Sequence, residues 1–339
     1  MQSKTIDHIN IWLIIISFVV AIYLPFELFL FSYAFLGPLH YLTEINWLDD
    51  KKFFFKSKVQ IYRVFIVFAI IIAAFPLLKY LESIESFKYL IDLLGPNKNS
   101  ILLLSGFVFS VSLIFLKKSK HILLAFLLSI LFSVVCALYI PKVAIVIGVF
   151  LPTLVHVYIF TLLFMIFGQL KAKSRPGLIS VLLLTLVPII IVFLDIKPST
   201  YVVSDYAKTS YSGSGFMSLN GSVAGLLGVD KKSFFLLSSI GVKIQIFIAF
   251  AYTYHYLNWF SKTSIIGWKS SLTNKRTKYI IILWLSSVGL YLYDYRTGII
   301  ALFFLSLLHV VLEFPLNITT IKELVIVVFK WLKLRFKKV

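Results

Sequence analysis

Residues 298–317 of the chain, GIIALFFLSLLHVVLEFPLN, form its clearest transmembrane signal. The stretch is apolar over the roughly 20 residues that an α-helix needs to cross the hydrocarbon core of a bilayer. It nevertheless carries His309 and Glu313 in its interior. Residues four apart share one face of a helix, so this imidazole and this carboxylate point the same way. Because ionisable groups at membrane depth are costly, they mark a candidate functional site.

Composition places the whole chain in the same class. Of its 339 residues, 60% are hydrophobic and only 14% are charged, whereas soluble proteins carry about 25% charged residues. We therefore predict an all-α, polytopic integral membrane protein. Cys136 is the only cysteine, which excludes disulfides and cysteine-rich metal sites. The formal charge of +19 is explained by basic loops facing anionic lipid headgroups rather than by nucleic acid.

About nine segments are long and apolar enough to be transmembrane helices. They cover residues 10–37, 59–79, 101–116, 121–140, 143–169, 177–195, 235–259, 279–293 and 298–317. We predict one transmembrane domain over residues 1–339, with an extracytoplasmic loop at 196–233. This loop is either an ordinary ordered loop or a segment whose apolar second half re-enters the membrane or caps a cavity. Residues 320–339 alternate apolar and basic residues, which is typical of an amphipathic helix lying on the membrane surface.

The loops also predict an orientation. Those on one side of the predicted spans hold roughly twice as many Lys and Arg residues as those on the other, and the positive-inside rule places the more basic side in the cytoplasm. The N-terminus is then expected outside and the C-terminus in the cytoplasm. The expected location is a bacterial inner (plasma) membrane.

Single histidines occur on four of these segments, at His40, His156, His255 and His309. Their segments are the first, fifth, seventh and ninth, which all cross the membrane in one direction. Counting along them places all four histidines between the midplane and the cytoplasmic surface. We therefore expect the four imidazoles to meet. His40 also repeats the local pattern of His309, because Glu44 follows it by four residues.

A cluster of this kind is typical of a metal site. Neutral imidazole is the commonest protein ligand for transition metals and suits iron, zinc and copper. We predict one metal ion held by these histidines, with Fe(II) as the first candidate and other transition metals left open. Glu44, Glu313 and Asn258 are candidate catalytic residues or partners that orient the imidazoles. The alternative is that each histidine only links helices by a hydrogen bond.

Aromatic and basic residues near the same positions are candidate substrate contacts. Aromatic rings at a membrane boundary are commonly interfacial anchors, but they would also line a slot for a lipophilic substrate. Arginines on the same face would bind a phosphate headgroup or ordinary lipid. The candidates are Tyr41, Trp47, Tyr254, Trp259, Arg63 and Arg175.

Short motifs around the histidines resemble the Brp/Blh-type bacterial β-carotene dioxygenases. The turn Gly37-Pro38-Leu39-His40, followed by Glu44, is similar to an early Pro-His-Gly-x-x-Asp element of that family. Tyr254-His255-Tyr256 resembles its later aromatic–histidine motif, and residues 308–313, LHVVLE, resemble its C-terminal His-x-x-Leu-x-Asp segment. His156 takes the place of a histidine on an earlier helix.

The resemblance covers about forty residues in short pieces, and it departs from the family at two positions. Tyr41 stands where the family has glycine, and Trp259 stands where it has a second histidine. The resemblance implies a polytopic fold, Fe(II), O2 and a lipophilic, isoprenoid-like substrate. It does not define carotene as that substrate.

Two other functional classes are compatible with the same residues. In a proton-coupled lipid or small-molecule transporter or flippase, the buried His and Glu groups would carry protons. In a metal-free lipid or glycan transferase, His309 or His255 would act as the general base while basic residues bind phosphate. Metal content separates the predicted oxygenase from both.

Overall fold

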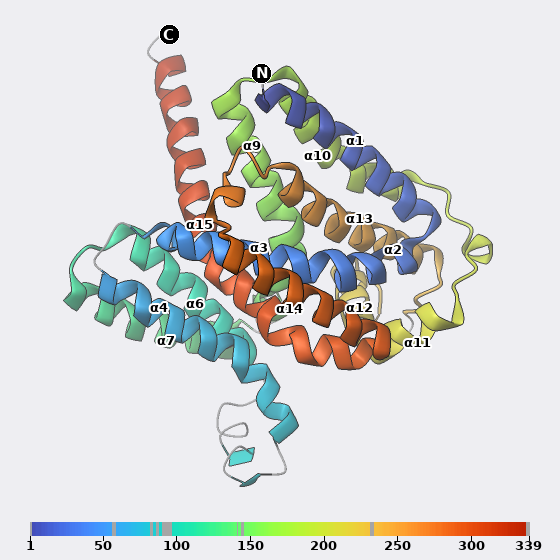
Figure 1. The fold of residues 1–339 in the computed structure, drawn as a ribbon, viewed down its shortest axis with the longest axis horizontal. Helices are drawn as coiled ribbons and strands as arrows, with labels where there is room; N and C mark the ends of the chain where they lie inside the picture. Colours follow the sequence, from blue (N-terminus) through green and yellow to red (C-terminus); the bar gives the residue numbers. More distant parts are fainter. Residues whose placement is uncertain are drawn as a thin grey trace.

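The computed structural model describes residues 2–55, 59–81, 84–85, 88–89, 97–140, 142–143, 146–230 and 234–336. Within these ranges every regular element is a helix (Figure 1). Seven helices of the described chain are long and apolar enough to cross a membrane: Lys4–Tyr23, Arg63–Leu81, Lys98–Phe115, Ser119–Tyr139, Val146–Ala172, Arg175–Phe193 and Tyr295–Lys330. The predicted all-α class is confirmed, and these helices are those expected of a membrane protein.

The predicted number of about nine spans is not confirmed. Two of the predicted spans correspond to α13 (Ser239–Ser261) and α14 (Asn274–Tyr293), which are long enough but lie outside the seven. Their sequences explain the difference. Tyrosines and buried polar side chains interrupt the apolar sequence of α13, and α14 has Lys275, Arg276 and Lys278 in its first turns.

The first predicted span, residues 10–37, is wrong as a single helix. Helix α1 (Gln2–Tyr23) ends just before Leu24, whose φ of −133° and ψ of 56° are not helical. Pro25 then begins a continuous helical segment made of α2 (Pro25–Phe31), the π-helical turn η1 (Ser32–Leu36) and α3 (Gly37–Asp50). A residue before proline avoids the α conformation, which explains the break. The chain turns back here, so His40 lies on the second helical segment (Figure 1).

This reversal changes the predicted position of the N-terminus. Near the start of α1, Asn10 Nδ2 donates a hydrogen bond to Ser261 Oγ (3.1 Å), and Ser180 Oγ donates one to the Asp7 carbonyl (3.2 Å). Ser261 ends α13, and Ser180 is near the start of α10 (Arg175–Phe193), so the N-terminus lies at the end of the bundle that carries basic loops. The start of α1 and the described end of α15 thus share one end of the bundle (Figure 1), and the side of the membrane that each faces stays a prediction.

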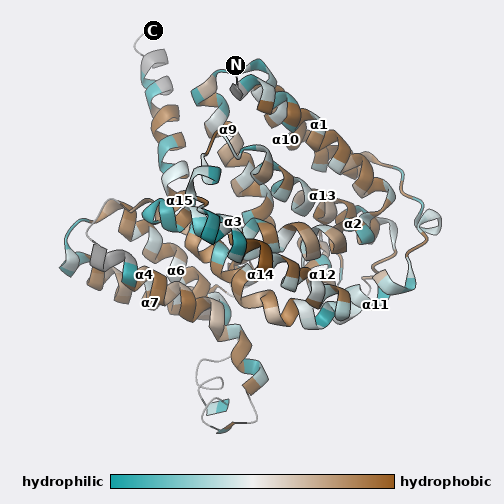
Figure 2. Cartoon of the chain, in the orientation of Figure 1, coloured by the Kyte–Doolittle hydropathy of each residue, from teal (hydrophilic) through white to brown (hydrophobic). Residues whose placement is uncertain are grey.

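The longest helix, α15 (Tyr295–Phe336), is central to the bundle and packs against α3, α14, α4 (Val59–Ala74) and α6 (Lys98–Phe115). The outer helices include α7 (Ser119–Tyr139) and α10, and η3 (Phe75–Leu81) extends α4. The π-helix η4 (Val146–Phe160) continues directly into α9 (Thr161–Ala172). Hydrophobic residues dominate α1, α4 and α7, whereas α3 has a hydrophilic half (Figure 2).

The predicted amphipathic tail is not a separate helix. Helix α15 passes through Pro315 without ending and continues to Phe336, so most of residues 320–339 prolong it; residues 337–339 lie outside the described chain. Its last turns extend away from the bundle (Figure 1). Val325, Val328 and Phe329 are exposed there, which leaves apolar surface available to lipid on this end of the helix.

Two apolar cores flank the middle of the bundle. One gathers around α13 and contains Phe250, Tyr254 and Leu42. The other gathers around α15 and contains Leu308 and Phe314. Helix α3 contributes Tyr41 and Leu42 to the first core and Trp47 and Leu48 to the second. His40 of the same helix is buried beside His255 of α13 and His309 of α15.

The loop at 196–233 contains the short helices η5 (Pro198–Thr200), α11 (Asp205–Gly213) and α12 (Met217–Leu226), of which α11 packs against α2 and α12 against α13. A buried polar network holds them. Gln245 Oε1 on α13 accepts hydrogen bonds from Tyr211 Oη (2.6 Å) and Asn220 Nδ2 (3.1 Å), while its Nε2 donates to the Pro25 carbonyl (3.0 Å). Tyr211 also bonds to Asn220. The network ties the loop to the break between α1 and α2.

Replacing Tyr211 with phenylalanine is expected to destabilise the protein by about 1–3 kcal/mol, because buried amide groups of Asn220 and Gln245 lose a partner. Thermal unfolding in detergent, followed by size-exclusion chromatography, measures the effect. Tyr206→Phe is the matched control, since Tyr206 is on the same helix but exposed. Equal melting temperatures for the two variants would contradict a structural role for the network.

Candidate metal centre

Four separate helices carry the buried histidines. His40 follows the π-helical turn η1, and His156 lies inside the π-helix η4. His255 lies on α13 and His309 on α15. Their exposed fractions are 1%, 2%, 7% and 5%, in that order. Because π-helical turns are rare and occur often at functional sites, their presence beside two of the four histidines sets this region apart.

The four imidazole rings lie next to one another. The Nε2 atoms of His156 and His309 are 3.1 Å apart, and those of His40 and His255 are 3.0 Å apart. Ring centroids are separated by 4.9 Å between His156 and His255 and by 5.4 Å between His40 and His309. The tertiary structure thus brings together residues up to 269 positions apart in sequence.

The two carboxylates that follow histidines by four residues meet different atoms. Glu313 Oε2 is 2.9 Å from His156 Nδ1, across helices, and accepts a hydrogen bond from Asn317 Nδ2 (3.2 Å). Glu44 Oε2 is 3.0 Å from His40 Nε2, within α3. Glu313 therefore lies behind His156, whereas Glu44 lies on the side where the Nε2 atoms converge.

Of the other three imidazoles, His255 has a partner on its Nδ1 side, since that atom is 2.8 Å from Thr161 Oγ1. The Nδ1 atoms of His40 and His309 are buried and have no hydrogen-bond partner among the described residues. Partners of this kind fix the orientation and tautomer of a ligating imidazole and leave its other nitrogen for the metal.

These residues fit a transition metal. Two nitrogens that bind one ion at about 2.0–2.1 Å are at most about 4.2 Å apart, and the Nε2 pairs at 3.0 and 3.1 Å meet that limit. The ligand atoms of His40, His156 and His309 all lie within 4.8 Å of one another. Three buried histidines are thus close enough to hold a metal ion, and His255 lies against the same group. The identity of the metal is a separate question.

Several predicted substrate residues do adjoin the group. The ring of Tyr41 is 5.7 Å from that of His309, and the ring of Trp259 is 5.4 Å from that of His40. Trp259 Nε1 donates a hydrogen bond to Thr43 Oγ1 (3.0 Å). Trp47 lies one layer further out, 5.5 Å from Trp259.

Other predicted residues lie elsewhere. The hydroxyl of Tyr254 donates to Asn10 Oδ1 (3.1 Å), on α1, so it faces away from the histidines. Arg63 and Arg175 are exposed near the starts of α4 and α10. Asn258 is buried one turn beyond His255, and among the described residues its Oδ1 has no hydrogen-bond partner. The structure gives it no contact with an imidazole, so its role stays a prediction.

Some neighbours of the centre were not predicted. Thr161, which contacts His255, has no sequence signal, since it acts across helices. Tyr256, whose ring is 5.2 Å from that of His40, follows His255 directly and gave no separate signal. Asn317 follows Glu313 by four residues, so the helical spacing that linked His309 to Glu313 also predicts the hydrogen bond between Asn317 and Glu313.

A basic residue, Lys262, lies near the start of α1, at the end of the bundle that carries the basic loops. Burial lowers the pKa of Lys262, just beyond α13, to about 8, and the charge of Asp7 opposes that shift. Lys262 is half-buried, while Lys269 is exposed. This arrangement is typical of a helix end near lipid headgroups and lies outside the histidine group.

No family model, no curated protein and no solved structure matches the chain. The function is therefore inferred from the chemistry of the centre itself.

Proposed function

We propose that the protein is an integral-membrane metalloenzyme of the oxygenase type, with one non-haem metal held by His40, His156, His255 and His309. The proximity of four buried imidazoles, of which those of His40, His156 and His309 are close enough to hold one ion, supports this proposal. Fe(II) is the first candidate, because imidazole and carboxylate are common iron ligands and because the histidine motifs resemble those of Brp/Blh-type dioxygenases.

The carboxylates have distinct proposed roles. Glu313 would accept from His156 Nδ1, from which it lies 2.9 Å, and thereby hold that imidazole with Nε2 toward the metal. Glu44 would take part on the metal side, as a further ligand or as a proton carrier. Bound iron would supply O2 activation. The protein residues would orient the ligands and exclude water, since the described site is buried between two apolar cores.

A dioxygenase reaction suits such a buried centre. When an alkene of a lipophile is cleaved by O2, both oxygen atoms enter the products and the two alkene carbons become carbonyls. The atoms and electrons balance without a further reductant. A lipophilic, isoprenoid-type substrate is proposed from the resemblance and from the bilayer setting. For the orientation of the protein, we propose that the end of the bundle with the basic loops faces the cytoplasm of a bacterial inner membrane. Both described ends of the chain then lie on the cytoplasmic side.

The proposal is tested first by metal content and then by oxygen incorporation. Detergent-purified protein is loaded anaerobically with Fe(II), desalted and analysed by inductively coupled plasma mass spectrometry. We expect about one iron per chain, as for a single mononuclear centre. The loaded protein is then incubated with 18O2 and the total lipid extract of its host, and products are analysed by mass spectrometry.

Labelled oxygen in a lipid product, dependent on bound iron, would support the oxygenase. Absence of any bound transition metal after loading with iron, zinc, copper or manganese would overturn the metal centre. Proton-coupled flux of a lipid, or transfer to a phosphate-bearing acceptor, would then be measured instead. Metal binding without 18O incorporation would retain the centre and overturn the oxygenase reaction.

A further inference from the structure

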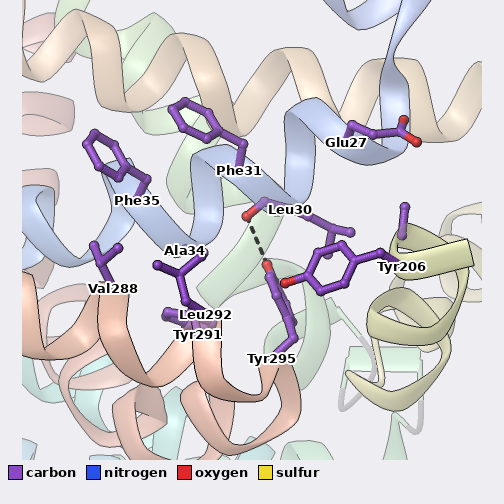
Figure 3. Close-up of a pocket in the computed structure, with 11 residues that line it drawn as sticks. Glu27, Leu30, Phe31, Ala34, Phe35, Tyr206, Val288, Tyr291, Leu292 and Tyr295 are labelled. Atoms are coloured by element: carbon purple, nitrogen blue, oxygen red, sulfur yellow. Dashed lines mark hydrogen bonds between the residues drawn. The ribbon is translucent and has the colours of Figure 1, made fainter. Parts of the chain in front are cut away.

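A cavity of about 380 Å³ lies away from the histidines, between α2–η1, α11, α14 and α15. Its lining includes Phe31 and Phe35 on one wall and Val288 and Leu292 on the other, with Tyr206 and Tyr295 beside Leu30 (Figure 3). This volume falls within the ~300–1,000 Å³ typical of small-molecule sites. Among the described residues the lining is almost entirely apolar, and none of those that line it is a lysine or arginine.

The cavity opens sideways, toward the surface that lipid would cover. Phe31 is 54% exposed, Leu292 is 76% exposed and Tyr206 is 59% exposed. These residues flank its mouth. Exposed apolar surface of this kind is typical of a face that contacts a membrane, so the mouth suits a ligand that arrives from lipid.

The carboxylate of Glu27 in the lining is hydrogen-bonded to the protein and does not bind a charged ligand. Glu27 Oε1 accepts hydrogen bonds from the backbone N–H (3.2 Å) and the hydroxyl (3.4 Å) of Ser204, at the start of α11. Its carboxylate is turned away from the cavity (Figure 3). Tyr295 Oη donates to the Leu30 carbonyl (3.0 Å). Since the described lining residues include no lysine or arginine, a carboxylate or phosphate headgroup would be desolvated among them without a partner.

Ring contacts connect the cavity lining with the metal centre, starting at Tyr291, which lines the cavity. A row of tyrosines continues from there: ring centroids are 6.4 Å apart for Tyr291 and Tyr33, and 5.2 Å apart for Tyr256 and His40.

Tyr252 completes this row. Its ring centroid is 6.0 Å from that of Tyr33 and 6.2 Å from that of Tyr256. At Gly37, a Cβ atom would lie 3.3 Å from the Tyr256 hydroxyl, so the absence of a side chain leaves room for that hydroxyl beside the helix. The tyrosine row therefore forms the wall between the cavity and the imidazoles.

We infer that this cavity binds one neutral, single-chain lipophile, such as a long-chain or isoprenoid alcohol, which enters laterally from the bilayer. The inference that a lipophile binds here rests on the cavity alone. Its use as the substrate site, with the inner end of the chain passing the tyrosine row to reach the metal, rests on the proposed function. An apolar wall that lacks cations selects an uncharged lipid over a fatty acid anion or a phospholipid.

Photolabelling tests this inference. The purified protein in lipid nanodiscs is irradiated with hexadecanol that carries a mid-chain diazirine, and labelled peptides are mapped by mass spectrometry. We expect labels on residues 27–35 and 288–295 about fivefold above those on lipid-exposed α7, as for a defined pocket. The matching diazirine hexadecanoic acid, ionised at pH 8, is expected to show no such enrichment.

Ala34→Trp fills the cavity from one wall and Val288→Phe from the other, and each is expected to remove the enrichment. Leu285→Trp is the control, since Leu285 lies on α14 with 56% exposure but does not line the cavity. Elution as a single size-exclusion peak verifies that each variant is folded. Enrichment that persists in both filled variants, or equal labelling by the alcohol and the acid, would show ordinary lipid contact only and overturn the inference.

Metal content measured on the same samples separates the two proposals. Enriched labelling of a protein that binds no metal would support the cavity and overturn the metal centre. A metal-loaded protein without enriched labelling would overturn the cavity and leave the metal centre standing.

Discussion

Replacing His309 with alanine is expected to lower bound metal from about one equivalent per chain to under about a tenth, because a buried ligand is lost and none replaces it. His309 Nε2 is 3.1 Å from His156 Nε2, and His309 faces His40 at a ring-centroid distance of 5.4 Å. The variant removes a nitrogen from the middle of the group. Oxygen incorporation should disappear with the metal. Inductively coupled plasma mass spectrometry after anaerobic Fe(II) loading measures the first effect.

His121→Ala is the matched control, since the same chemical change is made at an exposed histidine near the start of α7. It should retain full metal. His309→Gln, which keeps a hydrogen-bonding side chain of similar length, tests whether loss of metal reflects loss of fold. If both His309 variants elute as folded protein and keep stoichiometric metal, His309 is not a ligand and the four-histidine centre is wrong.

Glu313→Gln is expected to weaken metal affinity by about 10–100-fold without abolishing binding, the range found for partners of ligating histidines. The carboxylate oxygen lies 2.9 Å from His156 Nδ1 and also accepts from Asn317. A neutral amide loses the charge that makes the imidazole more basic. Competition against a metal chelator of known affinity gives the dissociation constant.

Glu323→Gln is the control for this measurement. Glu323 lies ten residues further along α15, beyond the histidine group, so the same change there should leave the affinity unaltered. Glu44→Gln provides the comparison inside the site. Because Glu44 Oε2 lies 3.0 Å from His40 Nε2, on the converging side, a larger loss than in Glu313→Gln would indicate direct ligation. An unchanged dissociation constant in Glu313→Gln would remove Glu313 from the metal centre.

Membrane class and helical structure were predictable because they depend on local sequence. A backbone surrounded by lipid must satisfy its own hydrogen bonds, so long apolar segments can only be helices. The pairing of His309 with Glu313 on one helical face follows from the 3.6-residue period alone. Pro25 was visible in the sequence too, but the reversal that it begins was not predicted, since a proline inside an apolar run can also be accommodated as a kink.

The sequence by itself thus determined that the chain is a bundle of apolar helices bearing four isolated histidines, and that two of them precede carboxylates at helical spacing. Only the tertiary structure decided which nitrogens converge. It placed Glu313 behind His156 rather than beside its own neighbour His309, and it turned Tyr254 toward Asn10. The same holds for the cavity beside Ala34. The physical reason is that side-chain direction across helices depends on helix packing and on the break at Leu24, which arise from contacts between residues distant in sequence.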